Sequence, residues 1–144
     1  MRYIGFDREE EAEQWARQKL NLPAAPEFFR AAAAVNEAGE FVCVVVMTNF
    51  TPRNVDLNIA IDKGKMTPKA TIVMFNAIFS FLFDKLGAAR VTGLLRGKNE
   101  ESRRITEHFG FQLEGIMRKA FPDDDLHVYG FLAEEYHAHA WRRG

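Results

Sequence analysis

The chain has 144 residues, of which 47% are hydrophobic and 27% charged, a balance typical of a folded globular protein rather than a disordered one. Its formal net charge is −1, so no overall positive field would attract nucleic acid or an anionic membrane. At this length we expect a single domain spanning residues 1–144.

Membrane, disulfide and metal classes are disfavoured by simple patterns. No apolar run is long enough to cross a bilayer, and Met1 leads into polar and acidic residues rather than an apolar signal segment. We therefore expect a soluble, cytoplasmic protein. Cys43 is the single cysteine and lies in an apolar run, which predicts a buried thiol and excludes an internal disulfide. His137 and His139 lack the i,i+4 spacing of helical metal ligands, so we expect no metal site.

The first third of the chain predicts a strand and a helix followed by a proline-rich break. Residues 2–6 favour a short strand, and Asp7 with Glu10 forms a capping box for a helix that runs to about Leu20. The prolines that follow leave at most a short second helix around residues 24–29.

The next three extended runs predict strands of one sheet. Phe29–Val35 and Glu40–Phe50 flank a turn that ends at Gly39, and the second run is apolar on both faces. A strand of this kind belongs in the interior of a sheet that is covered on each side. Val55–Ile61 follows as a third strand, whose polar residues share one face.

The helix predicted over Pro68–Leu86 is apolar around most of its circumference. A helix with one face on a sheet needs an apolar stripe of only about 100°. The excess predicts burial against a second surface, either a C-terminal segment or another subunit. Of these two we favour a subunit contact, which predicts a homo-oligomer.

The last third of the chain predicts a strand, a capped helix and a hairpin. Arg90–Leu95 is a short apolar strand, Asn99 is a helix N-cap, and Gly110 ends that helix. Two further strands, about 112–121 and 126–132, are joined by a tight acidic turn. A helical tail is expected over 134–143.

Several residues of this last third lie at the fixed spacings of a known family. Asn99-x-x-Ser102 is followed by His108-Phe-Gly-Phe111, by Glu114-Gly115 and by Arg118. This pattern resembles the second half of a GNAT-type N-acetyltransferase, most closely the branch that acetylates the N-termini of ribosomal proteins. A capped helix that leads into a strand would explain Asn99 and Gly110, but it does not require the remaining residues.

The resemblance implies a fold and a reaction. The fold would be α/β (α+β), with a mixed, mostly antiparallel sheet of six to seven strands, helices on both faces and a splayed parallel pair in the middle. The reaction would be direct transfer of an acetyl group from acetyl-CoA to a primary amine of a protein or a small molecule. Proximity supplies most of the rate in such a transfer, together with a base and an acid.

Roles for single residues also follow from the resemblance. Ser102 would protonate the departing thiolate and Asp56 would be the general base, although Asp56 also fits an ordinary solvent-facing carboxylate. Arg103 and Arg104 would reach the cofactor's phosphates or, alternatively, form a solvated helix face. The residues implied in cofactor binding are Ile59, Ala60, Ile61, Lys65, Met66, Thr67, Pro68, Lys69, Ala70, Asn99, Ser102 and Arg103.

The first helical segment and the second strand of the hairpin would border the acceptor amine. The aromatic and histidine side chains there, each of which also fits a packing role, are Trp15, Phe28, Phe29, His127 and Tyr129.

Two departures from the family pattern support a second interpretation. Met66 and Pro68 replace the glycines of the usual pyrophosphate loop, and Pro68 has no N–H to offer a phosphate. Thr106 stands where many relatives carry a catalytic tyrosine. The alternative is therefore a non-catalytic binding or assembly protein of the same fold, which oligomerises through the helix 68–86.

Overall fold

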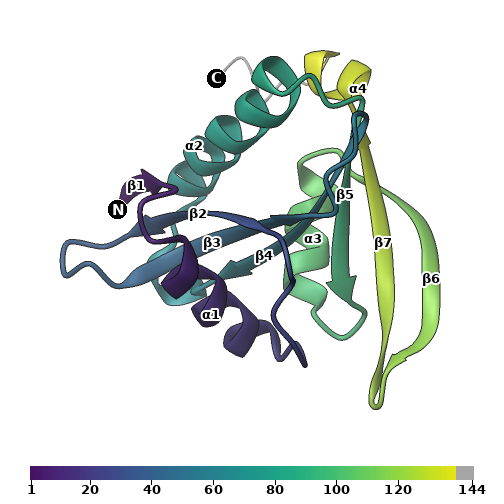
Figure 1. Cartoon of the computed structure of the whole chain (residues 1–144), viewed down its shortest axis with the longest axis horizontal. Coiled ribbons are helices and arrows are strands. Elements are labelled where there is room, and N and C mark those ends of the chain that lie inside the picture. Colours follow the sequence, from purple (N-terminus) through teal and green to yellow (C-terminus); the bar gives the residue numbers. More distant parts are fainter. Residues whose placement is uncertain (139–144) are drawn as a thin grey trace. The chain divides into compact units, whose positions relative to one another are not determined.

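We describe the protein from a computed structural model, which covers residues 1–138 in the description below. Seven strands form one sheet in the order β1-β2-β3-β4-β5-β7-β6 (Figure 1). In chain order the elements are β1 (Arg2–Gly5), α1 (Glu9–Leu20), β2 (Arg30–Val35), β3 (Phe41–Thr48), β4 (Asn54–Ile61), η1 (Lys63–Lys65), α2 (Pro68–Phe79), η2 (Ser80–Lys85), β5 (Arg90–Arg96), α3 (Glu100–His108), β6 (Gln112–Phe121), β7 (Asp124–Leu132) and α4 (Ala133–Ala138).

The strand pairing confirms the predicted mixed sheet. β4 and β5 pair in parallel, with Asn54 opposite Arg90 and Leu57 opposite Gly93. β1–β2, β2–β3, β5–β7 and β6–β7 are antiparallel. Contacts along the chain divide it into two compact units, which are described separately: unit 1 comprises Met1–Asn49 and Asn58–Ile78, and unit 2 comprises Phe50–Leu57 and the chain from Phe79 onward.

The core of unit 1 is built on β2 and β3. α1 lies over one face of β2 and β3 (Figure 1). On this face, small and β-branched side chains from the two strands pack against Ala12 and Ala16 of α1. Alanines at these helix positions let α1 lie close to the sheet. On the opposite face Ala32, Cys43 and Val45 are also fully buried. Both faces of β3 are therefore covered, as its sequence predicts.

The start of α1 differs from the prediction. The N-cap residue is Arg8 rather than Asp7, and within the described chain its side chain makes no capping hydrogen bond. The Asp7 N–H instead donates to the Ile4 carbonyl at 3.3 Å, so Asp7 belongs to the turn that leaves β1. Arg8 donates through Nη1 to the Gly39 carbonyl at 2.7 Å, which holds the beginning of the helix against the β2–β3 turn. No second helix forms over residues 24–29, which are a loop.

Unit 2 is organised around Phe79. Its ring is fully buried, and ring centroids of five other aromatic residues lie 5.4–6.4 Å from it. Their edge-to-face and tilted arrangements are those that aromatic pairs prefer. The members of this aromatic cluster are Phe79, Phe83, Phe109, Phe111, Phe131 and Tyr136.

The aromatic cluster explains why the helix from Pro68 onward is apolar on so many sides. Tyr136 comes from α4, stacks on Phe83 at 4.8 Å and donates a hydrogen bond to Asp84 at 3.1 Å. The second surface against this helix is thus the chain's own C-terminal segment, and Phe79 is unavailable to another subunit. The helix is also not uniform, since it changes at Ser80 into the π-helical segment η2, where the Leu86 N–H donates to the Phe81 carbonyl.

The C-terminal hairpin forms as predicted and its turn is shorter than expected. Phe121 pairs with Asp124, so Pro122 and Asp123 alone make the turn and β7 begins two residues early. β6 lies at one edge of the sheet and is exposed along nearly its whole length. The predicted tail helix is present as α4, and its remainder, including His139, falls outside the described residues.

Candidate functional site

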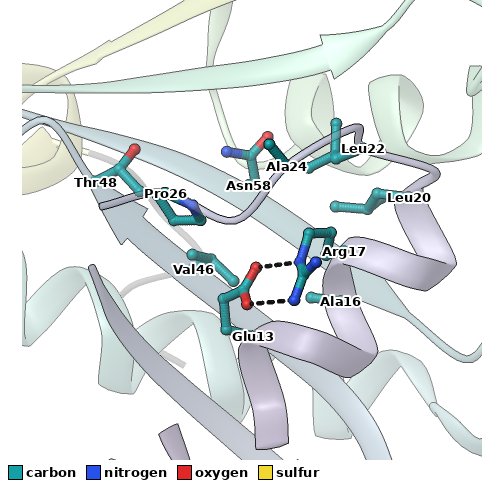
Figure 2. A pocket seen from close by; sticks show the side chains of 10 residues that line it. All are labelled: Glu13, Ala16, Arg17, Leu20, Leu22, Ala24, Pro26, Val46, Thr48 and Asn58. Atoms are coloured by element: carbon teal, nitrogen blue, oxygen red, sulfur yellow. Dashed lines mark hydrogen bonds and ion pairs between the residues drawn. The ribbon is translucent and has the colours of Figure 1, made fainter. Parts of the chain in front are cut away.

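Unit 1 contains a pocket between α1, the loop after it, and the strands β3 and β4 (Figure 2). Its volume is about 160 Å³. Most of the lining side chains are apolar, with four polar ones among them, which is the usual composition of small-molecule sites. The lining residues are Glu13, Ala16, Arg17, Leu20, Leu22, Ala24, Pro26, Val46, Thr48 and Asn58.

An ion pair forms one wall of this pocket. Arg17 lies one helical turn after Glu13 and donates to both of its carboxylate oxygens, through Nε at 3.0 Å and Nη2 at 3.3 Å (Figure 2). The Glu13 side chain is only 7% exposed and that of Arg17 is 32% exposed. A carboxylate this buried needs a partner to stay charged, and the two-pronged geometry is the strong form of such a pair.

The residues that the sequence proposed for the acceptor wall do not line this pocket. Trp15 packs against Phe41 with ring centroids 5.8 Å apart, and Phe28 is 79% exposed. Ala16 and Arg17, which follow Trp15 in the chain, line it instead. A signal for this was present in the sequence, since Glu13 falls on the same face of α1 as Ala16 and has an arginine four residues later.

The segment predicted to cradle pyrophosphate has the helix start that the sequence suggested. Thr67 caps α2 by accepting the Ala70 N–H at 3.1 Å, and Pro68 is the first helical residue. Both features use up or remove backbone donors that an anion would need. Lys65 lies between two carboxylates, 3.7 Å from Glu40 and 3.6 Å from Asp62, so part of its charge is already compensated.

The predicted cap of α3 is confirmed. The Asn99 side-chain oxygen accepts the Ser102 N–H at 3.4 Å, while Arg103 donates through Nε to the Gly97 carbonyl at 2.9 Å. Asn99, Ser102 and Arg103 therefore lie together at the start of α3, directly after β5. Thr106, at the position of the missing tyrosine, is 6% exposed.

A line of hydrogen bonds crosses one face of unit 2 and ends at Asp56. Arg90 donates to Thr92 Oγ1 at 3.2–3.3 Å, Thr92 donates to Asn54 Oδ1 at 2.7 Å, and Asn54 donates to Asp56 Oδ1 at 2.8 Å. We call these four residues the Asp56 chain. At its other end Arg90 forms a two-pronged ion pair with Glu114.

The ion pair at the outer end of the Asp56 chain spans a strand. Arg90 belongs to β5 and Glu114 to β6, and β7 lies between them. The pair passes over Gly130, where an added Cβ would overlap the Glu114 carboxylate. A bare backbone at this position is therefore what allows the two side chains to meet.

Tyr129, one of the two candidates from the hairpin, is fully buried in unit 2. Its hydroxyl donates to Glu107 Oε1 at 2.9 Å. Burial, followed by this bond to a carboxylate, raises the pKa of Tyr129 above its ordinary value. His127 lies against Gly97, where a Cβ would come within 2.8 Å of Nε2. Neither residue lines the pocket of unit 1.

Of the three strand residues implied in cofactor binding, Ile59 and Ala60 are buried and Ile61 is partly exposed. Ile59 is 8% exposed and Ala60, which belongs to the core of unit 1, is 1% exposed. Any ligand beside this part of β4 would meet backbone groups more than side chains.

Within residues 1–138 no helix has both the length and the apolarity for crossing a membrane. This described part also lacks a cluster of three or more side chains suited to a metal ion.

Comparison with known proteins identifies the fold. Neither a protein-family model nor a curated protein sequence matches the chain. Among solved structures, a protein described as a probable acetyltransferase is 17% identical with a TM-score of 0.69, over 92% of this chain and 98% of that one. A spermidine N-acetyltransferase chimera from Vibrio cholerae and human sequences is 16% identical with a TM-score of 0.66, over 90% and 80%.

A third structure carries the family name. It is an acetyltransferase of the GNAT family from Bacillus anthracis, 17% identical with a TM-score of 0.61, over 73% of this chain and 67% of that one. None of these three names supports the narrower likeness to the ribosomal-protein branch. Identities this low establish a shared fold and no more. The fold of this chain is that of GNAT-type acetyltransferases.

Proposed function

We propose that the protein is an N-acetyltransferase, which moves an acetyl group from acetyl-CoA to a primary amine held in the pocket of unit 1. One observation carries the proposal beyond the fold. Asn58 lines the pocket and lies on the same face of β4 as Asp56, two residues or about 6.6 Å along the strand. We assign the role of general base to Asp56 from this position on the strand.

The chemistry needs a proton acceptor and a proton donor. Asp56 takes one proton from the substrate ammonium and passes it to water, which leaves a nucleophilic amine. A bond then forms between this nitrogen and the acetyl carbonyl carbon as the carbon–sulfur bond breaks. The second proton lost by the nitrogen replaces the one that the Ser102 hydroxyl gives to the departing sulfur. The products are a neutral amide and a thiol, with no covalent enzyme intermediate.

Cofactor binding would use the backbone of Ile59–Ile61 and the start of α3. Asn99 keeps its side-chain NH₂ group for a ligand even while its oxygen caps the helix. The N-terminus of α2 offers a favourable dipole for phosphate, with Lys65 and Lys69 beside it. Because Thr67 and Pro68 reduce the available N–H donors there, we expect acetyl-CoA to bind more weakly than to a glycine loop.

The non-catalytic alternative depends on the same altered loop. It also required the helix 68–86 to form a subunit contact, and Phe79 of this helix is buried inside unit 2, where it cannot take part in such a contact. Homo-oligomerisation therefore stays a prediction without a defined surface.

Calorimetric titration with acetyl-CoA tests the proposed function. We expect micromolar affinity, and Asn99→Ala should raise Kd about tenfold by removing one hydrogen bond. Asn99→Ala should also destabilise the fold by about 1 kcal/mol, because a helix cap is lost.

Asn99→Ser is the matched control, because serine caps a helix as well as asparagine but has no NH₂ group. It should keep the stability and still lose affinity. Wild-type affinity in this variant would mean that Asn99 is only a cap. Absence of binding by the wild-type protein at millimolar acetyl-CoA would overturn the enzyme proposal.

A further inference from the structure

The lining of the pocket in unit 1 carries information about the acceptor. Six of its ten residues are apolar, and Thr48 and Asn58 are neutral and polar. Glu13 and Arg17 are the charged members, and they form an ion pair with each other. The pocket wall is thus electrically neutral as a whole.

The ion pair also occupies both oxygens of the carboxylate that could otherwise bind an ammonium group. Nε of Arg17 bonds Oε2 of Glu13 at 3.0 Å, and Nη2 bonds Oε1 at 3.3 Å. A cationic group that binds at this wall would have to displace Arg17 from Glu13. Otherwise it would lose its hydration without gaining a carboxylate to pair with. Both are costly where the carboxylate is nearly buried.

The size of the pocket limits the apolar group that it can accept. A dry cavity of about 150 Å³ lined by apolar side chains holds one benzene molecule. The pocket here, at about 160 Å³, has room for a group of that size. A branched five-carbon or single-ring substituent therefore fits, whereas a long extended chain would not be enclosed.

We propose that the acceptor is a primary monoamine with a compact apolar substituent, and that Arg17 excludes diamines and polyamines by neutralising Glu13. This inference rests on the proposed function, which supplies the orientation of the bound amine toward Asp56. The proposed preference for monoamines would distinguish this protein from the spermidine acetyltransferase of the same fold. The pair Glu13–Arg17 becomes the determinant of acceptor charge.

The test compares 3-methylbutylamine with 1,5-diaminopentane, which carries a second ammonium at similar length. Binding is measured by saturation-transfer NMR without acetyl-CoA, and kcat/KM is measured with it. Wild type should bind and acetylate the monoamine at least about tenfold better. Arg17→Gln frees the Glu13 carboxylate, so its affinity for the diamine should rise about tenfold or more, with no rise for the monoamine.

Two further variants control for indirect effects. Glu13→Gln with Arg17→Gln removes both charges and should not gain diamine binding. Ala24→Phe, at an exposed loop position of the lining, should block the monoamine while leaving the fold intact, as judged by circular dichroism. This variant keeps the test valid if Arg17→Gln fails to fold.

The binding and turnover arms separate the two proposals. Selective monoamine binding without acetylation would sink the proposed function and support the pocket assignment. Equal binding of the two amines by wild type, or no gain by a folded Arg17→Gln protein, would overturn the inference whatever the turnover. Monoamine binding that survives Ala24→Phe would overturn it as well.

Discussion

The Asp56 chain has a direction. Every donor in it points toward the carboxylate, from the Arg90 guanidinium through the Thr92 hydroxyl to the Asn54 amide. Successive hydrogen bonds of one polarity strengthen each other, and here they begin at a cation and end at an anion. The arrangement holds Asp56 in one orientation, with Oδ1 engaged by Asn54.

Removing the middle of the chain should lower turnover. Thr92→Val removes the hydroxyl that links Arg90 to Asn54. The Asn54 side chain is then no longer held in place, and neither is the Asp56 carboxylate that it bonds. Because a positioned base contributes about 10²–10⁴-fold, we expect kcat to fall about tenfold with KM for acetyl-CoA within twofold. Steady-state kinetics with a monoamine acceptor measure both values.

Thr92→Ser is the control, since it keeps the hydroxyl and should restore most of the wild-type kcat. A drop of similar size in both variants would point to packing rather than to orientation of Asp56. An unchanged kcat in Thr92→Val would show that the chain has no role in turnover.

Local sequence patterns indicate Asp56, the last residue of the Asp56 chain, but not the residues Thr92 and Asn54 that connect it to Arg90. Asp56 stands out as an acidic residue on an apolar strand, and Asn99 as a helix cap, because both signals are local. Thr92 and Asn54 are 38 positions apart, and their contact depends on the parallel register of β4 and β5. No local pattern encodes that register.

At the scale of elements, the helix that starts at Pro68 carries the largest difference between expectation and structure. Its excess of apolar residues was predicted to have a second partner, and the partner is the chain's own aromatic cluster. Phe83 of η2 contacts Phe131 of β7 and Tyr136 of α4, which follow about fifty residues later, so no local pattern indicates these contacts. From the sequence alone we favoured a subunit contact instead. The sequence also did not predict the π-helical segment Ser80–Lys85, because such segments are rare inside an α-helix.

Phe79→Ala should destabilise the protein without changing its mass in solution. Truncation of a fully buried phenylalanine typically costs 3–5 kcal/mol, through lost burial and the cavity left behind. Urea denaturation measures the loss, and light scattering measures the mass. A variant of unchanged stability with a smaller mass than wild type would restore the subunit contact that the sequence favoured.

Phe81→Ala offers a matched control on the same segment. Phe81 is partly exposed, whereas Phe79 is fully buried, so its truncation should cost less than that of Phe79.

At the scale of the whole molecule, folding keeps one thiol protonated over an unusual range. Cys43 is fully buried in β3, and burial raises its pKa to about 12. In the unfolded chain the thiol ionises near pH 8.5. Between these values the unfolded state binds fewer protons than the folded state, so stability falls as pH rises.

We expect Cys43 to lower the free energy of unfolding by about 1.4 kcal/mol for each pH unit above about pH 9. Urea denaturation of wild type and Cys43→Ala at pH 8, 9 and 10 measures it, and subtraction removes the lysine and tyrosine contributions. Parallel curves for the two proteins would contradict the burial of this thiol. Below pH 8 the two should show the same pH dependence.

The architecture as a whole was more predictable than the pocket within it. Strand positions follow from local alternation and turns, and they came out within about two residues. The pocket draws on α1, on a loop without regular structure, and on two strands. Its residues are patterned for the helix and strands to which they belong, so their convergence appears only in three dimensions.

The ion pair of Arg90 and Glu114 over Gly130 limits which substitutions the sequence can accept at position 130. A Cβ at position 130 would overlap the end of the Glu114 side chain, so Glu114 and Arg90 would have to move and their ion pair, which is linked to Asp56, would be disturbed. Gly115, on the neighbouring strand β6, meets nothing within 4 Å and has no such constraint. In a lineage of homologues, glycine at 130 and the acid–base pair at 90 and 114 should persist or disappear together, while position 115 varies independently.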